Sequence, residues 1–449
     1  MAKHSSEPKG AAHGSGEKSA RKGWIAGTGI VVAAILVAWW YVRAQGDRIV
    51  IESFRVTHDA DAAVDSSAAA ARFTNSLLRV LNESDSKMKA PGFGPAPMPP
   101  DVEVPKTGLS LSTLTTLLSD LFGYDPVRIN ADLVDRNTSL TLYLRIASPE
   151  FERDQSLSIP GTEAELPALF DSAARDAIKI IAPVALAGYC RTHRRECDPT
   201  IALEYALSQP PADDDVWALN MWAAILMRDG QMPLAEQRLK HALVLQPNFP
   251  LALFNYGYLR AAQHRLMEAA EFYRRAIDAG DARTKAIAYN NLGDVLLDDK
   301  NMKGAEDAYR SATTTGEAAV GSAQELSTAY SNLGYVQYVQ SRWDEAVESY
   351  ERAAALNASD PTPLIGLASA LEEKKQIYEA LPILRMAVSA DRQSSEAWFY
   401  LAEWHRQYGD KQLAITDFNA VIQLNKDPDL VKQATELRDK LAAPAEGTK

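Results

Sequence analysis

The two cysteines of this 449-residue chain are the first residues whose chemistry can be weighed. Cys190 and Cys197 lie seven positions apart in CRTHRREC, at an expected turn between helices, so their side chains can meet. In an oxidising compartment such a pair forms a disulfide, whereas in a reducing one it stays as two thiols. Redox-active pairs usually follow C-x-x-C or lie at a helix N-terminus, and neither feature is present. We expect a structural disulfide or two inert thiols.

The other groups capable of catalysis are scattered. Seven histidines occur, and His264 at an expected turn and His405 on a helix face are typical of solvated or packed side chains rather than bases. The sequence has no G-x-S-x-G, H-E-x-x-H, Walker or G-x-G-x-x-G motif outside an apolar run. We therefore predict no catalytic, cofactor-binding or metal-binding residues, no small-molecule substrate, and a protein that is not an enzyme.

The charge balance bears on the class of partner. The chain carries 59 acidic and 47 basic residues, a formal net charge of -12, and 46% of its residues are apolar. Binding to nucleic acid requires a concentrated basic face, so we expect no nucleic-acid partner. The apolar content and the length are sufficient for two or three domains.

The elements that must position a site are set by a motif that returns six times between Trp217 and Phe418. Its clearest copies begin NYGYL at Asn255, NLGDV at Asn291 and NLGYV at Asn332. One alanine of the motif recurs at Ala235, Ala269, Ala305, Ala346, Ala380 and Ala414. The intervals are 34, 36, 41, 34 and 34 residues, a spacing typical of paired helices. The region resembles the tetratricopeptide repeat, which implies helical hairpins stacked into an α-solenoid.

The residue types of the motif have packing reasons. Two helices cross closely only where side chains are small, so we expect Gly257, Gly293 and Gly334 to face the motif alanines. Gly230 and Gly409 are expected at turns that need a left-handed residue. The motif asparagine is expected to hydrogen-bond between neighbouring hairpins.

The resemblance also implies a binding surface, because in this family the first helices of successive hairpins line a concave groove. The register places in it Trp217, Asn220, Phe254, Tyr258, Asn290, Asp294, Ser331, Tyr335, Tyr338, Phe399, Glu403 and Arg406. Aromatic and amide side chains with few cations suit an extended peptide or a partner helix. The alternative is that these aromatics pack within or between hairpins. The paired Lys and Asn of the family's carboxylate clamp are not found at these positions.

The N-terminus differs in composition from the rest of the chain. Residues 1–22 are rich in Gly, Ser, Ala, Lys and Arg, which predicts a disordered tail. Residues 23–42 are uncharged and have Trp24 and Trp39 near their ends. A helix of that length spans roughly 30 Å, so we predict a transmembrane helix at 23–43. A cleaved signal peptide is the alternative, but the run is long and does not end in small residues.

The flanking charges predict an orientation. Five Lys or Arg residues precede the apolar run, and three follow it by Arg55. The positive-inside rule then places the N-terminus in the cytoplasm. The predicted localisation is a bacterial inner membrane, single-pass, with the bulk of the chain in the periplasm.

Residues 48–182 have strand and helix patterns unlike the repeats. The expected elements are strands at 48–56, 127–134, 139–146 and 155–159, and helices at 61–81, 109–122 and 162–180. Strict alternation in the second and third strands predicts a β-hairpin. Thr162 and Glu165 are spaced as a capping box. The order predicts an α+β sandwich with helices on one face of a mixed or antiparallel sheet. It resembles small domains that precede tetratricopeptide arrays in bacterial envelope proteins.

Together these patterns predict a mainly α protein. The expected divisions are a tail at 1–22, a transmembrane helix at 23–43, an α+β domain at 48–182 with a Pro-rich loop at 91–105, a solenoid at 183–426, and a capping helix and tail at 427–449. The predicted function is that of a membrane-anchored, non-enzymatic scaffold or adaptor that binds a protein or peptide partner in envelope complex assembly. A membrane-tethered sensor or regulator, a cytoplasm-facing scaffold and an envelope enzyme are the alternatives.

Overall fold

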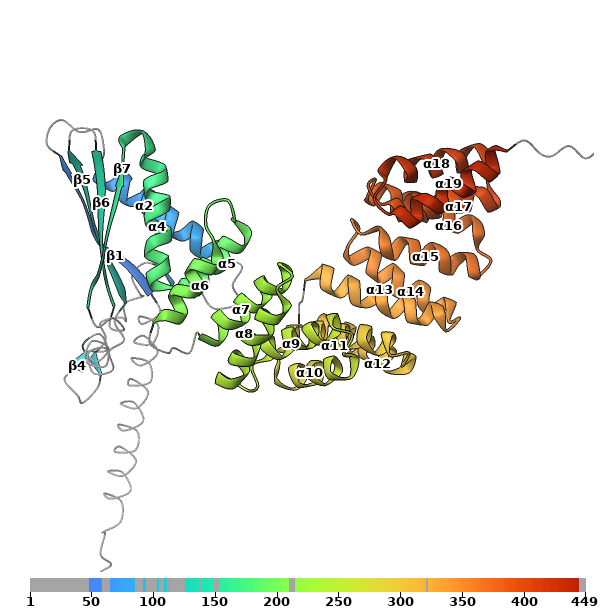
Figure 1. Cartoon of the computed structure of the whole chain (residues 1–449), viewed down its shortest axis with the longest axis horizontal. Coiled ribbons are helices and arrows are strands. Elements are labelled where there is room, and N and C mark those ends of the chain that lie inside the picture. Colours follow the sequence, from blue (N-terminus) through green and yellow to red (C-terminus); the bar gives the residue numbers. More distant parts are fainter. Residues whose placement is uncertain are drawn as a thin grey trace, which may run out of the picture. The chain divides into compact units, whose positions relative to one another are not determined.

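The computed structural model describes most of the chain and shows a mainly α fold. The described residues are 48–58, 65–84, 92–93, 103–104, 109–110, 113, 126–136, 139–148, 153–209, 215–319 and 322–443. The chain divides into two compact units, Met1–Ala218 and Leu219–Lys449. Within the described ranges there are 17 α-helices and a small sheet (Figure 1). The residue boundaries predicted for the domains stay predictions.

The first unit is built on a five-stranded mixed sheet. Its strands are β1 (Arg48–His58), β2 (Gly92–Phe93), β5 (Val127–Arg136), β6 (Ser139–Ala147) and β7 (Gln155–Gly161). Their order is β2-β1-β5-β6-β7, with β1 parallel to both of its neighbours and β5, β6 and β7 antiparallel. The hairpin predicted from the alternating pattern is therefore confirmed. A separate two-stranded ribbon pairs β3 (Glu103–Val104) with β4 (Leu109–Ser110).

Helices pack on the buried face of this sheet. They are α2 (Ser66–Asn82) and α4 (Leu166–Ile181). The next helices are α5 (Pro183–Thr192), which contacts α2 and α4, and α6 (Pro199–Ser208), which contacts α5. Every second residue of β6 is buried, as expected when one face of a strand is covered. Phe54 of β1, Phe73 of α2 and Phe170 of α4 bring their ring centroids within 6.2 to 6.4 Å of one another. This cluster joins the sheet to both helices.

Two local predictions in this unit need correction, one of them only in where its helix begins. The helix predicted at 109–122 does not begin at Leu109, because Leu109 and Ser110 pair with β3; most of its remainder lies outside the described residues. The capping box at Thr162 is not formed, since a 3-10 turn at Glu163–Glu165 precedes α4. The Thr162 hydroxyl donates instead to the Glu165 carboxylate at 3.0 Å.

The localisation prediction also needs correction. None of the helices in the described ranges is long and apolar enough to cross a membrane, so a single-pass inner-membrane protein with a periplasmic bulk is wrong for this part of the chain. The longest described helices have 17 residues and carry polar faces, whereas a span needs about 20 consecutive apolar residues. The tail at 1–22 and the helix predicted at 23–43 lie outside the described residues.

The second unit is a run of helical hairpins. Its helices are α7 (Asp215–Arg228, which begins in the first unit), α8 (Met232–Leu245), α9 (Pro250–Ala262), α10 (Leu266–Ala279), α11 (Ala282–Asp298), α12 (Met302–Ala318), α13 (Ala323–Val339), α14 (Trp343–Leu356), α15 (Pro361–Glu373), α16 (Ile377–Ala390), α17 (Ser395–Tyr408), α18 (Lys411–Leu424) and α19 (Pro428–Ala442). From α9 to α17, each odd-numbered helix pairs with the even-numbered helix after it (Figure 1). All six motif alanines are fully buried between the helices of their hairpins. Helix α19 covers the apolar side of the last hairpin.

The turns within the hairpins follow one design in five of the six copies. The residue with positive φ is Gly230, His264, Lys300, Ser341 or Lys375. The residue after it donates its backbone N–H to the carbonyl five positions earlier, which closes the end of the first helix. Gly409 differs from the prediction, because its φ of -120° is not left-handed. Its turn is one residue shorter, and the next helix begins with Asp410 as its N-cap.

The motif glycines make room for tyrosine rings rather than for the motif alanines. A Cβ at Gly257 would lie 2.8 Å from the Tyr273 ring, and one at Gly293 would lie 2.5 Å from Tyr309. Real Cβ atoms do not approach this closely, so any larger residue would displace the ring. Each glycine therefore fixes the depth at which a tyrosine is buried.

Candidate functional site

The first helices of successive hairpins, α7, α9, α11, α13, α15 and α17, adjoin one another and form what we call the first-helix face. As far along the face as α13, motif asparagines bind the preceding hairpin. Asn255 Nδ2 donates to Asn220 Oδ1 of the preceding hairpin at 2.8 Å. Asn332 Nδ2 donates to Asn290 Oδ1 and Asp294 Oδ1 of the preceding hairpin, each at 3.1 Å. The expected bridging role of the asparagine is present in both copies.

These bonds occupy polar groups that the sequence placed in the groove. The Asn220 side chain is buried, and Asp294 also accepts a bond from the Tyr309 hydroxyl at 2.7 Å. Groups that are already paired gain little from a partner, because binding would first break an existing bond. We call these bonds between hairpins, from Asn255 to Asn220 and from Asn332 to Asn290 and Asp294, the asparagine ladder.

The second half of the face contains an open cavity, which we call the tyrosine groove. It has a volume of about 370 Å³ and lies between α13, α14, α15 and α17. It is lined by Ser331, Asn332, Tyr335, Tyr338, Tyr350, Thr362, Ile365, Gly366, Ser369, Glu396 and Tyr400. Tyr335 is 50% exposed and Tyr400 is 43% exposed. Three predicted residues, Ser331, Tyr335 and Tyr338, therefore share one cavity.

One sequence change explains why the cavity exists. Counting from the motif alanines, Gly366 occupies the position that holds asparagine at Asn255, Asn291 and Asn332. Glycine has no side chain to reach back to the preceding hairpin, so the ladder stops there. Ser331 and Tyr335, which hold the register of Asn290 and Asp294, are left facing the cavity.

The same glycine shapes the floor of the groove. A Cβ at Gly366 would overlap the ring of Tyr350, and one at Gly334 would lie 3.0 Å from it. The Tyr350 ring is thus held between two glycines from neighbouring hairpins. It is 5% exposed, so it forms the floor, whereas Tyr335 and Tyr400 form the walls.

Carboxylates border the groove. Glu396 lines it, and Glu372 and Glu373 end α15 close to Tyr338. Burial, followed by the neighbouring Glu373 and Glu403 charges, raises the pKa of Glu372. Burial, followed by Glu396, likewise raises the pKa of Tyr400. Both shifts have the direction expected where negative charge is unfavourable, and a cation would relieve it.

Other predicted groove residues are used differently. The Phe254 ring lies 5.7 Å from Tyr273, and the Phe399 ring lies 5.8 Å from Phe418, so both pack inside their hairpins. The remaining members are Trp217, which is half-buried on α7, Tyr258, which is 49% exposed, and Glu403, which pairs with Arg406 at 2.7 Å. These residues do not line the tyrosine groove.

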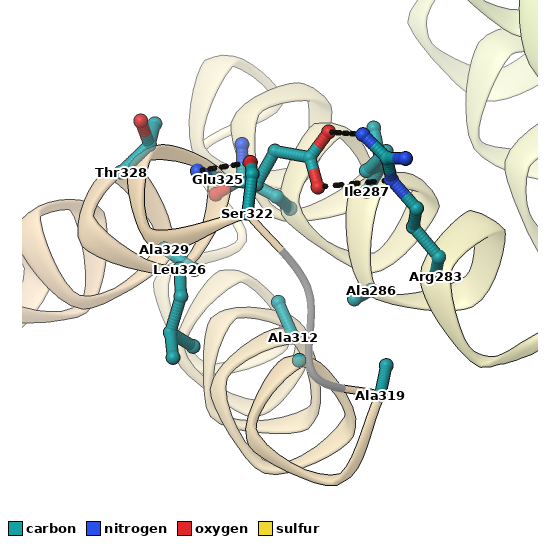
Figure 2. A pocket seen from close by; sticks show the side chains of 12 residues that line it. Arg283, Ala286, Ile287, Ala312, Ala319, Ser322, Glu325, Leu326, Thr328 and Ala329 are labelled. Atoms are coloured by element: carbon teal, nitrogen blue, oxygen red, sulfur yellow. Dashed lines mark hydrogen bonds and ion pairs between the residues drawn. The ribbon is translucent and has the colours of Figure 1, made fainter. Parts of the chain in front are cut away.

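A smaller cavity of about 130 Å³ lies between α11, α12 and α13 (Figure 2). Its walls are mostly small and apolar and include Ala286, Ala312 and Ala329. The Arg283 guanidinium and the Glu325 carboxylate pair across it, with Nη2 and Oε1 3.0 Å apart. Because its charged groups satisfy each other, this cavity offers a partner fewer open polar groups than the tyrosine groove.

The candidate catalytic groups of the sequence lie elsewhere. His405 Nδ1 is 2.6 Å from Asp417 Oδ2, and both side chains are more than nine-tenths buried between α17 and α18. A general base must reach a substrate, so this pair packs the hairpin. Within the described ranges no group of three or more His, Cys, Asp or Glu side chains could hold a metal ion. Cys190 and Cys197 form a disulfide, with Cα atoms 5.2 Å apart.

The sequence prediction missed eight of the eleven residues that line the groove, including the four that shape it most. Tyr350, Gly366, Glu396 and Tyr400 line it, but none was among the predicted site residues. The available signal was the order Asn332, Gly366, Tyr400 at one motif position. A break in an otherwise repeated asparagine marks the point where the ladder ends and the face opens.

Part of the chain matches models of a known protein family. Models of the tetratricopeptide repeat match residues 220–284, 284–359 and 331–395. No curated protein matches the chain. Among solved structures, one described as Pseudomonas aeruginosa pilF is 19% identical to this chain. The match covers 50% of this chain and 98% of that one, with a TM-score of 0.43. PilW, described as a type IV pilus biogenesis factor, is 18% identical, with 49% and 99% coverage and a TM-score of 0.43.

A third solved structure carries a description of binding. YrrB, described as a TPR protein with an unusual peptide-binding site, is 20% identical, covers 44% of this chain and 97% of its own, and has a TM-score of 0.34. Because the identities and TM-scores are low, these three likenesses carry no information about the partners of this chain.

Proposed function

Because residues 220–395 carry tetratricopeptide repeats, we propose that this protein is an interaction scaffold whose tyrosine groove holds a segment of a partner protein. The groove binds and makes or breaks no bond. Repeats of this kind supply rigid surfaces built from neighbouring hairpins, and their partners are proteins or peptides. The partner segment lies across α13, α15 and α17, where the asparagine ladder has stopped.

One observation supports this assignment above the others: two tyrosines are about half exposed on a cavity of about 370 Å³. In the described part of the chain, the hydroxyls of Tyr335 and Tyr400 form no hydrogen bond, so they are open to a peptide backbone. Tyrosine gives a large contact area for little loss of conformational freedom and is enriched at binding hot spots. The buried Tyr350 floor holds the walls in place before a partner arrives, which lowers the cost of binding.

The experiment begins with a phage-displayed library of random 12-residue peptides panned on the full chain. Enriched peptides are synthesised with a fluorescein label, and their Kd values are measured by fluorescence anisotropy. Tyr335→Ala and Tyr400→Ala should each raise Kd by about tenfold or more, since truncating a hot-spot residue costs roughly 1 to 2 kcal/mol. Tyr378→Ala is the matched control, because Tyr378 is 80% exposed on α16, outside the groove.

The proposal can fail in two ways. Peptides that bind the Tyr335→Ala/Tyr400→Ala double variant as well as the original chain would place the binding surface elsewhere. Equal losses for Tyr378→Ala and Tyr335→Ala would indicate nonspecific contact with exposed aromatic rings. Far-UV circular dichroism of each variant shows whether the fold is kept.

A further inference from the structure

The charges of the first-helix face are divided unevenly. Helices α13, α15 and α17 together contain five carboxylates and one arginine. Glu325 is neutralised by Arg283 and Glu403 by Arg406. In the described part of the chain, Glu372, Glu373 and Glu396 form no ion pair. The groove is therefore bordered by unpaired negative charge.

The tyrosine rings add a second preference. The face of an aromatic ring attracts Lys and Arg side chains, and the attraction strengthens where water is partly excluded. The chain uses this contact in its own hairpins: the Arg238 guanidinium lies 3.9 Å from the Trp222 ring centre, and that of Arg260 lies 4.6 Å from the Tyr256 ring centre. The exposed rings of the groove have no such cation among the described residues.

We propose that the occupant of the tyrosine groove is a basic peptide segment, with Lys or Arg side chains lying against the rings of Tyr335 and Tyr400 and meeting Glu372 and Glu396. This inference rests on the proposed function and specifies the chemistry of the partner. An acidic segment would face like charges directly, and like-charge contacts act against a wrong partner. An apolar segment would leave the carboxylates partly desolvated and unpaired, which costs free energy.

The test uses three synthetic peptides of one length. The basic probe is Ala-Ala-Arg-Leu-Ala-Arg-Leu-Ala-Ala with an N-terminal fluorescein. The second carries citrulline in place of both arginines, which keeps the shape and removes the charge. The third carries glutamate there. The basic peptide should bind the full chain at least tenfold more tightly than the citrulline peptide, and the acidic peptide should bind most weakly.

Variants then locate the charge effect. Glu372→Gln/Glu396→Gln should raise the Kd of the basic peptide about tenfold and leave the citrulline peptide within about twofold, because attraction between charges is lost and contact with the rings is kept. Glu351→Gln is the matched control: it removes one exposed carboxylate from α14, outside the groove. It should change Kd by less than about twofold.

The outcomes separate this inference from the proposed function. If the basic and citrulline peptides bind equally and Tyr335→Ala weakens both, the preference for a basic partner is wrong, but the groove is still the binding site. A second outcome is that Tyr335→Ala does not change the Kd of the basic peptide and that Glu351→Gln weakens binding as much as Glu372→Gln/Glu396→Gln does. The peptide is then attracted generally to a chain of net charge -12, and both the inference and the proposed function are wrong. Equal Kd values for the Glu372→Gln/Glu396→Gln variant and the original chain would also contradict the inference.

Discussion

The two halves of the first-helix face hold side chains at the same register positions and use them in opposite ways. Helices α7, α9 and α11 carry three carboxylates and four Lys or Arg residues, whereas α13, α15 and α17 carry five carboxylates and one Arg. In the first half, Asp294 accepts bonds from Tyr309 and Asn332. In the second half, Tyr335 at the equivalent position is half exposed on the groove.

The difference shows that a repeat array can change its surface without changing its hairpins. Both halves keep the buried motif alanine and a large ring from the second helix. What changes is the residue that reaches back to the preceding hairpin, asparagine at Asn332 and glycine at Gly366. The stability of each hairpin and its capacity to bind are thus encoded at separate positions.

The largest expected effect separates a packing tyrosine from a groove tyrosine. Tyr309→Ala should lower the free energy of unfolding by about 3–5 kcal/mol, because it leaves a cavity beside Gly293 and removes one of the two hydrogen bonds to Asp294. Tyr335→Ala should change it by no more than about 0.5 kcal/mol. Urea midpoints followed by circular dichroism measure both. Similar midpoints for the two variants would break the distinction between the halves.

An ion pair in the first half should give the next largest effect. Arg260 is 7% exposed and binds Glu236 in two places, with Nη2 2.9 Å from Oε1 and Nη1 3.2 Å from Oε2. Glu236→Gln should destabilise the chain by roughly 2 kcal/mol at pH 7, because a buried guanidinium loses one of its two counter-charges and keeps only Glu268, whose Oε2 lies 3.3 Å from Arg260 Nε. Glu351→Gln, at an exposed site, is the control and should be nearly neutral.

The pH dependence of that variant tests its cause. The Arg260 and Lys240 side chains lower the pKa of Glu236 from its ordinary value of 4.5 to about 2. The stabilisation is therefore fully present above about pH 4.5 and is lost as the pH falls toward 2. The gap in urea midpoint between the original chain and Glu236→Gln should close over that range. A constant gap would point to packing instead of charge.

The second half should respond to acid in the opposite sense. The pKa of Glu372 is raised, so its ionisation costs stability in the folded state, and protonation on acidification removes that cost. Glu372→Gln should therefore stabilise the chain slightly at pH 7 and lose this advantage as the pH falls below the raised pKa. Thermal unfolding at several pH values measures it. Destabilisation at pH 7 would show that Glu372 has a partner in solution.

Gly366 controls whether the groove is open. Gly366→Ala should destabilise by about 1–2 kcal/mol, although alanine favours helix, because its Cβ would overlap the Tyr350 ring. Displacing that ring should also weaken peptide binding. Ser369→Ala, one turn later on α15 and also lining the groove, is the stability control and should stay within about 0.5 kcal/mol. If Gly366→Ala leaves the stability unchanged, the Tyr350 ring can move aside at no cost in free energy.

The sequence was sufficient to predict the helical hairpins, since the motif alanines and large rings recur at fixed spacing and set both helix period and contact. It also predicted the β5–β6 hairpin, because alternation over two adjacent segments has one simple solution. The open groove was only half predicted. Which first-helix side chains are free depends on hydrogen bonds from the next hairpin, such as Asn332 to Asn290, and a register does not reveal them.

The turns show the same limit and give the smallest expected effect. Glycine predicted a left-handed residue at Gly409, yet the positive φ values fall at His264, Lys300, Ser341 and Lys375 besides Gly230, because hydrogen bonds at the helix end impose the conformation whatever the side chain. Lys300→Gly should therefore stabilise by about 0.5–1 kcal/mol, by removing the cost of a Cβ at φ 62°. Urea midpoints measure it, and Asp307→Gly at an exposed position in the interior of α12 should destabilise by a similar amount. A loss of stability for both variants would mean that added freedom of the unfolded chain outweighs the relieved strain, and that these turns are held by their bonds alone.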